Sequence, residues 1–321
     1  MRERRARTDS ILWLAAVACL GVTLLAVTLL AVASAAQQQG AATPPPPNSS
    51  AGEQRERSIR VDVDLVLVPV TVLDPGGRLV TGLERHHFRI YEEGQEQEIL
   101  HLSTEEAPIS VGLVLDTSGS MSSQMSDAQR AALQFFRTAN PRDEFFLVEF
   151  NTRARMVSNF TTGLEPLQSR VMYSRARGNT ALFDAVYLAL DEMRRARNTR
   201  RAVLIISDGA ENHSRYNEND IRRALREADL QFYAIGQFDR VGRDILSHMA
   251  NLTGGRLFGT QFLENTANRI WSELRNQYVI AYRPANTQRD GKWRKVKIKL
   301  DVPRGMPDLQ VFAKSGYYAP K

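Results

Sequence analysis

Three oxygen-bearing side chains stand close together where an apolar run of the sequence ends. Asp116, Ser118 and Ser120 lie in Asp-Thr-Ser-Gly-Ser, directly after the run Ile109–Leu115. Carboxylates, hydroxyls and water are hard oxygen ligands, which suit octahedral Mg²⁺ or Mn²⁺ better than zinc. Small hydroxyl ligands also let the backbone approach an ion closely. Taken alone, this spacing is common enough to arise by chance, so its position in the fold decides its weight.

Two more oxygen-bearing side chains are expected at the same place in the fold. Thr180 ends a Gly-Asn-Thr sequence just before a helical pattern, and Asp208 follows the apolar run Ala202–Ile206 after a single serine. The carboxyl ends of parallel strands meet at one edge of a sheet, where ligands bind. We therefore predict a Mg²⁺ or Mn²⁺ site there, formed by Asp116, Ser118, Ser120, Thr180 and Asp208.

Simpler interpretations exist for each motif. Asp and Ser also cap helices and form turns, Asp208-Gly209 alone is typical of a turn, and Gly-Asn-Thr alone is typical of a cap. A buried strand ending in Asp116 also occurs in haloacid-dehalogenase-like phosphatases, but that family needs a second Asp where Ser118 stands. The joint occurrence of the three motifs favours the metal site over a metal-dependent phosphatase.

The elements that position these residues alternate between buried strands and amphipathic helices. We expect strands at Ile109–Leu115, 145–148, 202–206, 232–235 and 256–258, because each is a short apolar run. Apolar residues at three- and four-residue spacing predict helices at 127–138, 181–195, 218–228, 243–252 and 262–276. This alternation predicts an α/β fold with a doubly wound, mostly parallel, Rossmann-like sheet over residues 109–276.

In both segments that flank this α/β region, apolar and polar residues alternate with a period of two. Residues 59–105 read as N-terminal β strands, with a type II or similar turn at Asp74-Pro75-Gly76-Gly77 and a hairpin that joins 88–91 to 99–100. Residues 277–321 alternate in the same way. We expect the C-terminal strands to pair with the N-terminal ones in a flanking β module.

The N-terminus carries an export signal. Four arginines precede an uncharged run, 11–33, which is 23 residues long and whose last residue begins the sequence Ala33-Ser34-Ala35-Ala36. At 1.5 Å per residue such a helix crosses a hydrocarbon core of about 30 Å. Residues 1–36 are thus a cleaved signal peptide or a retained membrane anchor, with the remainder outside the cytoplasm in either case. Residues 37–58, with four consecutive prolines, are a Pro-rich linker.

Composition excludes several classes of function. The net charge is +6, of which the first 36 residues contribute +2, so no nucleic-acid partner is indicated. The single cysteine, Cys19, lies inside the apolar run, which leaves the exported part without disulfides, thiolate zinc sites or a cysteine nucleophile. The sequence also contains neither a phosphate-binding Gly-x-x-x-x-Gly-Lys-Ser/Thr loop nor a His-Glu-x-x-His helix.

The motifs resemble those of the von Willebrand factor type A domain with a metal-ion-dependent adhesion site. The resemblance covers about residues 109–276 and rests on Asp116-x-Ser118-x-Ser120, Thr180 and Asp208-Gly209 in order and in strand context. It implies that Ser118, Ser120 and Thr180 bind the metal directly, and that Asp116 and Asp208 act through bound waters. The flanks, including Gly77–Leu83 and Tyr278–Tyr282, are similar to those of bacterial exported proteins related to this domain.

This resemblance implies a function without catalysis. We expect a non-enzymatic, adhesion-type module in the bacterial envelope, periplasmic, secreted or anchored in the inner membrane, that binds a protein ligand through an exposed acidic residue at the Mg²⁺. Contact with the membrane would run through the N-terminal segment if it is uncleaved. An envelope-complex assembly or stress factor built on the same domain is the alternative. The resemblance also implies that the helix 262–276 can slide when the metal site changes.

Overall fold

The computed structural model describes residues 65–104, 106–260, 263–302, 305 and 308–321. The signal or anchor at 1–36, the linker at 37–58 and the start of the expected N-terminal strands lie outside these residues. Within the described part of the chain, no helix is long and apolar enough to cross a membrane.

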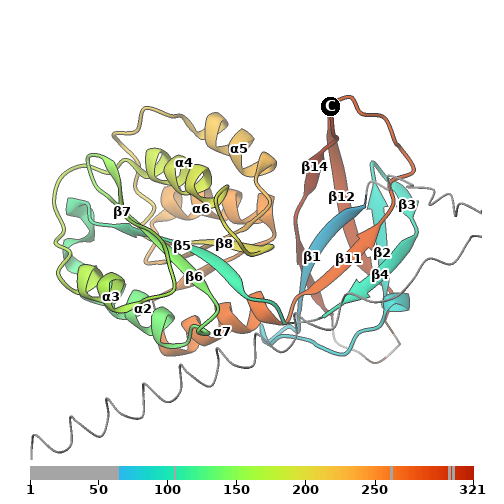
Figure 1. The fold of residues 1–321 in the computed structure, drawn as a ribbon, viewed down its shortest axis with the longest axis horizontal. Helices are drawn as coiled ribbons and strands as arrows, with labels where there is room; N and C mark the ends of the chain where they lie inside the picture. The colour runs from blue at the N-terminus through green and yellow to red at the C-terminus, as the bar shows by residue number, and fades with distance from the viewer. Residues whose placement is uncertain (1–64, 105, 261–262, 303–304, 306–307) are drawn as a thin grey trace, which may run out of the picture. The chain divides into compact units, whose positions relative to one another are not determined.

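The centre of the fold is a six-stranded sheet in the order β10-β9-β8-β5-β6-β7. Figure 1 labels four of these strands, β5 to β8. Five strands are parallel, and β7 runs antiparallel to β6 at one edge. The mixed α/β fold with a mostly parallel sheet is therefore as predicted. The strand bounds are β5 Ile109–Asp116, β6 Glu144–Phe150, β7 Ala154–Thr161, β8 Arg200–Ile206, β9 Gln231–Gly236 and β10 Leu257–Gly259.

Helices cover both faces of this sheet because successive strand residues point to opposite sides. Apolar residues of α2, α3 and α7 pack on one face around Trp271 and Phe135, and those of α4, α5 and α6 pack on the other around Phe146 and Phe232. The helix bounds are α2 Met125–Arg137, α3 Glu165–Met172, α4 Leu182–Met193, α5 Glu218–Glu227, α6 Arg240–Thr253 and α7 Leu263–Arg275.

The sequence patterns missed two elements of this domain. Strand β7 is only half-buried along its length, so its residues lack the continuous apolar run that marks the inner strands. Helix α3 has eight residues and buries only Leu167 and Val171, too few to show a helical period. Both lie at the margin of the sheet, where burial constrains sequence least.

The flanking strands form two antiparallel four-stranded sheets, ordered β13-β1-β11-β4 and β14-β12-β2-β3. C-terminal β11 lies between β1 and β4, and C-terminal β12 pairs with β2, so both sheets combine strands from the two ends of the described chain. The strand bounds are β1 Val66–Leu73, β2 Phe88–Glu92, β3 Gln95–Gln97, β4 Ile99–Ser103, β11 Tyr278–Tyr282, β12 Trp293–Leu300, β13 Gln310–Ala313 and β14 Gly316–Tyr318.

A buried carboxylate ties the two sheets of this β module together. Glu92 of β2 is 3% exposed and accepts hydrogen bonds from Tyr282 of β11 at 2.7 Å and from Tyr317 of β14 at 2.9 Å. Both phenols have a raised pKa, first because of burial and then because of their bonds to this carboxylate. One acidic side chain therefore joins three strands.

In the β module one local prediction, the second hairpin, was wrong, and the predicted tight turn at 74–77 is present with a different type. The 88–91 strand pairs with 95–97 across Glu93-Gly94, whereas Ile99 and its neighbours belong to the other sheet next to β11. In the turn that begins at Asp74, the positive φ of 73° falls on Gly77, the fourth residue, rather than on Gly76. The turn is therefore of type I followed by a left-handed glycine, not type II.

Trp271 of α7 provides a test of the core. Its ring stacks on Phe135 with centroids 4.5 Å apart, and its indole N–H donates to the Phe135 carbonyl at 2.9 Å. Trp271→Ala is expected to lower the free energy of unfolding by about 3–5 kcal/mol, since a large buried side chain is lost. Trp271→Phe retains an aromatic ring but loses the hydrogen bond, and it should cost about 1–2 kcal/mol.

Chemical denaturation followed by circular dichroism measures both values. Tyr173→Ala serves as a control, because that side chain is 77% exposed and its removal should change stability by less than about 0.5 kcal/mol. Equal stabilities of the Trp271→Ala and Tyr173→Ala proteins would contradict this description of the core.

Candidate functional site

Asp116 is the last residue of the central strand β5 and is fully buried. One carboxylate oxygen accepts the backbone N–H of Ser118 at 2.8 Å, and the other accepts the hydroxyl of Ser207 at 2.6 Å. Ser207 directly follows the neighbouring strand β8, so this carboxylate joins the loops after both strands. It does so at the carboxyl edge of the parallel sheet.

The two serines of the first motif lie side by side. Their hydroxyl oxygens are 3.0 Å apart, with Ser118 buried and Ser120 exposed at the start of the short 3-10 helix Gly119–Ser123. This spacing places two neutral oxygens together, one below the surface and one on it.

Backbone hydrogen bonds attach the loop that carries Thr180 to the first motif. The Gly119 N–H donates to the Gly178 carbonyl at 2.9 Å, and the Arg177 N–H donates to the Thr117 carbonyl at 2.8 Å. Gly178 has a φ of 81°, and an added Cβ would lie 2.6 Å from the Thr152 hydroxyl. A side chain there would both strain the backbone and collide. The glycine of Gly-Asn-Thr is thus required by the turn.

The third loop is attached to Thr180 through Asn212. The Asn212 side chain accepts the Thr180 N–H at 2.9 Å, and the Thr180 carbonyl accepts the backbone N–H groups of Asn212 and His213, each at 3.1 Å. Asp208, at the start of this third loop, is half-buried and caps it by accepting the Ala210 N–H at 3.0 Å. The three predicted loops therefore form one hydrogen-bonded unit.

The charges at this edge are unbalanced. Burial, and to a smaller extent the negative charge of Asp208, raise the pKa of Asp116 to about 6, despite hydrogen bonds from Ser118 and Ser207 that lower it. The hydrogen-bond donors to Asp116 in the described residues are neutral. In the described part of the chain neither Asp116 nor Asp208 forms an ion pair, and two carboxylates with two or more hydroxyls are a donor set that fits a hard divalent cation.

In the structure Ser118 contacts both Asp116 and Ser120, and the charge of Asp208 acts on Asp116. Backbone hydrogen bonds hold the Thr180 loop against the first and third loops. Which of these side chains bind a metal stays a prediction. Within the described residues no three or more His, Cys, Asp or Glu side chains cluster to hold a metal, and the site proposed here is of a different kind, since it depends on hydroxyls.

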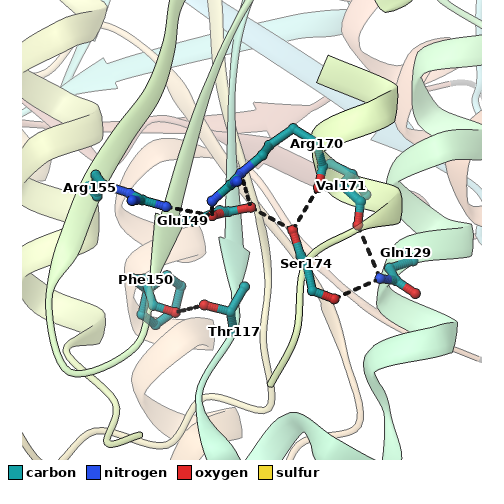
Figure 2. A network of polar contacts seen from close by, with 8 residues as sticks. All are labelled: Thr117, Gln129, Glu149, Phe150, Arg155, Arg170, Val171 and Ser174. Carbon is teal, nitrogen blue, oxygen red and sulfur yellow. Dashed lines mark hydrogen bonds and ion pairs between the residues drawn. The ribbon is translucent and has the colours of Figure 1, made fainter. Parts of the chain in front are cut away.

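A second buried carboxylate, which we did not predict, supports the Thr180 loop (Figure 2). Glu149 of β6 has a side chain that is 8% exposed and accepts two bonds from Arg170, at 3.1 and 2.8 Å, and one from the Ser174 hydroxyl at 2.5 Å. Arg155 of β7 approaches it at 3.4 Å. A charged residue inside the apolar run Phe145–Phe150 was the signal that could have identified it.

Gln129 of α2 completes this support. Its side-chain amide donates to the carbonyls of Val171, Met172 and Ser174 at 3.0–3.1 Å. Figure 2 shows this contact beside the Glu149 cluster, so the end of α3 is fixed from two sides just before the loop turns toward Gly178. Ser207 and Asn212 were likewise missed, because single polar residues in loops carry no sequence period.

Comparison with known proteins agrees with the predicted family. Residues 111–211 match the model of the von Willebrand factor type A domain family. This stretch, which includes every residue of the predicted site, is therefore a von Willebrand factor type A domain. No curated protein matches the chain.

Several solved structures are similar at low identity. An aerotolerance-related membrane protein from Bacteroides fragilis is 17% identical, with 52% of this chain and 98% of that chain covered and a TM-score of 0.45. A von Willebrand factor type A protein from Catenulispora acidiphila is 13% identical, with 80% and 74% covered and a TM-score of 0.46. BatB from Bacteroides thetaiotaomicron is 15% identical, with 51% and 98% covered and a TM-score of 0.42.

Glu149→Gln tests whether the buried carboxylate holds the Thr180 loop. The neutral amide keeps the shape but weakens the bonds to Arg170 and Ser174, which should cost about 1–3 kcal/mol. We expect faster hydrogen exchange at 173–180, with the exchange of β8 and β9 changed less. Glu165→Gln, at an exposed position on α3, is the matched control. Exchange at 173–180 that is the same in both variants would show that Glu149 does not position this loop.

Proposed function

We propose that this protein is a non-enzymatic, divalent-cation-dependent protein-binding module that acts outside the cytoplasm. The observation that carries the proposal is the convergence of three loops at the carboxyl edge of the sheet. There the Asp116 carboxylate accepts the Ser118 backbone N–H, and the Ser118 and Ser120 hydroxyls lie 3.0 Å apart. Ser118, Ser120 and Thr180 would hold the metal directly, and Asp116 and Asp208 would hold it through water. Mg²⁺ is the expected ion, with Mn²⁺ as its substitute.

The bound ion would supply a positive charge that attracts a carboxylate from a partner protein. The residues around the site favour such a partner. Ser120, Asn179 and His213 are exposed, and so are Arg175 and Arg177 on the Thr180 loop. Because cations on the rim raise the local concentration of anions, they would accelerate association with an acidic surface.

The place of action follows from the N-terminal segment, which we propose directs the folded part out of the cytoplasm. Within the envelope the module would act as an adhesion-type receptor for one acidic protein ligand. N-terminal sequencing of the mature protein would distinguish cleavage near residue 36 from retention as an anchor.

Isothermal titration with Mg²⁺ tests the metal site. Wild-type protein should bind one ion, Asp116→Ala should not bind detectably, and Ser120→Ala should bind at least about tenfold more weakly, since each removes a ligand or its charge. Ser123→Ala is the matched control, because Ser123 is an exposed serine in the same 3-10 helix. Equal binding by wild type and Asp116→Ala, or by neither, would contradict the proposal.

Capture of a partner tests the binding function separately. Immobilised protein should retain one or more envelope proteins in Mg²⁺ and release them in EDTA, because the ion would bridge to the partner's carboxylate. The Asp116→Ala protein, matched for folding by circular dichroism, should retain none of them. Proteins retained equally with EDTA would indicate a binding surface elsewhere on the chain.

A further inference from the structure

A cavity lies at the edge of the central sheet opposite to the predicted metal site. It has a volume of about 390 Å³ and is bounded by the starts of β8 and β9 on one side and by β1, β4 and β11 on the other. Because these central strands are parallel, their amino ends and their carboxyl ends lie at opposite edges. The cavity therefore shares no residue with the predicted metal site.

One wall of the cavity is apolar. Pro69 of β1 is the direct partner of Val279 of β11, and Leu67 lies two residues before Pro69 on the same face. All three line the cavity, together with Leu230 and Leu274 on the facing domain. Leu67 is 59% exposed, an unusual exposure for a leucine inside a paired strand, so the wall offers apolar surface that a ligand would remove from water.

The charged side chains that line the cavity are mainly cationic. Arg201 and Lys314 line the cavity beside one acidic lining residue, Asp229, whose side chain is 72% exposed. Arg200 also lines it, but its guanidinium interacts with the Glu106 carboxylate. Arg200 donates to the carbonyls of Leu274 and Arg275 at the end of α7. The surplus of positive charge gives this small volume an affinity for anions.

Lys314 is the most informative of these cations, because its side chain is only 14% exposed. Its ammonium donates to the Ala228 carbonyl at 2.9 Å and lies 3.8 Å from the Asp229 carboxylate, beyond hydrogen-bond distance. An ammonium has three donors, so this geometry leaves donors for another acceptor. Burial lowers the pKa of Lys314, and the Asp229 carboxylate opposes this effect only in part.

We propose that this cavity binds a small apolar carboxylate, with the carboxylate at Lys314 and Arg201 and the hydrocarbon part against Leu67, Pro69 and Val279. Its volume lies in the range of small-molecule sites, about 300–1,000 Å³. A neighbouring cavity of about 400 Å³ shares Leu67, Asp229 and Lys314 with it, which provides room for a longer hydrocarbon chain.

The backbone at this place favours a small molecule over an added peptide strand. Strand β13 pairs with Val70–Leu73, and no other strand of the described residues pairs with Val66–Pro69 on that side. Pro69 has no N–H to donate, and proline at an edge interrupts strand addition. A peptide would therefore find few main-chain hydrogen bonds there, whereas a carboxylate with an apolar tail needs none.

Isothermal titration of the full-length protein with octanoate tests the proposal. EDTA in the buffer removes divalent cations, so that binding at the predicted metal site does not contribute. Octanoate should bind, and 1-octanol, which has the same chain without the charge, should bind at least about tenfold more weakly. Lys314→Met, which removes the ammonium at similar volume, should weaken octanoate binding by at least about tenfold. Leu67→Glu, which places a carboxylate on the apolar wall at an exposed position, should have a similar effect.

Two controls match these variants in type. Lys297→Met changes an exposed lysine on β12, and Leu65→Glu changes an exposed leucine that does not line the cavity. Both should bind octanoate as wild type does. The proposal is overturned if octanoate does not bind, if 1-octanol binds as tightly, or if Leu67→Glu and Leu65→Glu behave alike. Tighter binding of a leucine-ended tetrapeptide than of octanoate would overturn the choice of a small molecule.

Discussion

The buried, desolvated carboxylate of Asp116 is the constraint on which the loops at the carboxyl edge of the central sheet depend. A charge placed at the end of the central strand, fully out of contact with solvent, must be compensated by hydrogen bonds or by a cation. The Ser118 N–H and the Ser207 hydroxyl compensate part of it and at the same time fix the first and third loops. Burial and the neighbouring charge of Asp208 still raise its pKa to about 6. The remaining imbalance is what makes this edge suited to a divalent ion.

The middle loop is positioned in a different way. It makes backbone hydrogen bonds to the first loop at Gly178 and Arg177 and to the third at Thr180. Glu149 and Gln129 hold the segment that leads into it, through Arg170 and Ser174. Charged and amide side chains with low exposure thus hold a loop that itself contains mostly small or exposed residues. Pre-organisation of this kind lowers the entropy lost when a ligand binds.

The sequence predicted the parts of the structure that burial determines. Strand β5 is a continuous apolar run, and the helices on either side of the sheet have apolar residues at helical spacing. This alternation predicted the α/β fold, and the fold predicted which residues lie at the strand ends. The half-buried β7 and the short α3 were missed for the opposite reason. In the β module, Ile99 alternates as any strand residue does, and alternation does not reveal which of two sheets a strand joins.

The candidate site divides in the same way. Side chains with unusual chemistry at strand ends, such as Asp116 and Asp208, could be predicted from position and residue type. Ser207 and Asn212 could not, because their roles depend on the distance between loops that are far apart in sequence. The cavity beside Lys314 was also beyond prediction, since its walls come from segments that are up to 247 positions apart, Leu67 and Lys314.

Paramagnetic broadening by Mn²⁺ tests the central claim, that the three loops form one cation site, most directly. In proton–nitrogen correlation spectra of the isotope-labelled protein, a low ratio of Mn²⁺ should broaden the amide signals of Gly119, Asn179 and Gly209 together. Signals of Arg201 and Gln231, at the opposite edge of the sheet, should keep their width. Excess Mg²⁺ should restore the broadened signals. Broadening confined to one loop, or centred on the opposite edge, would contradict the account.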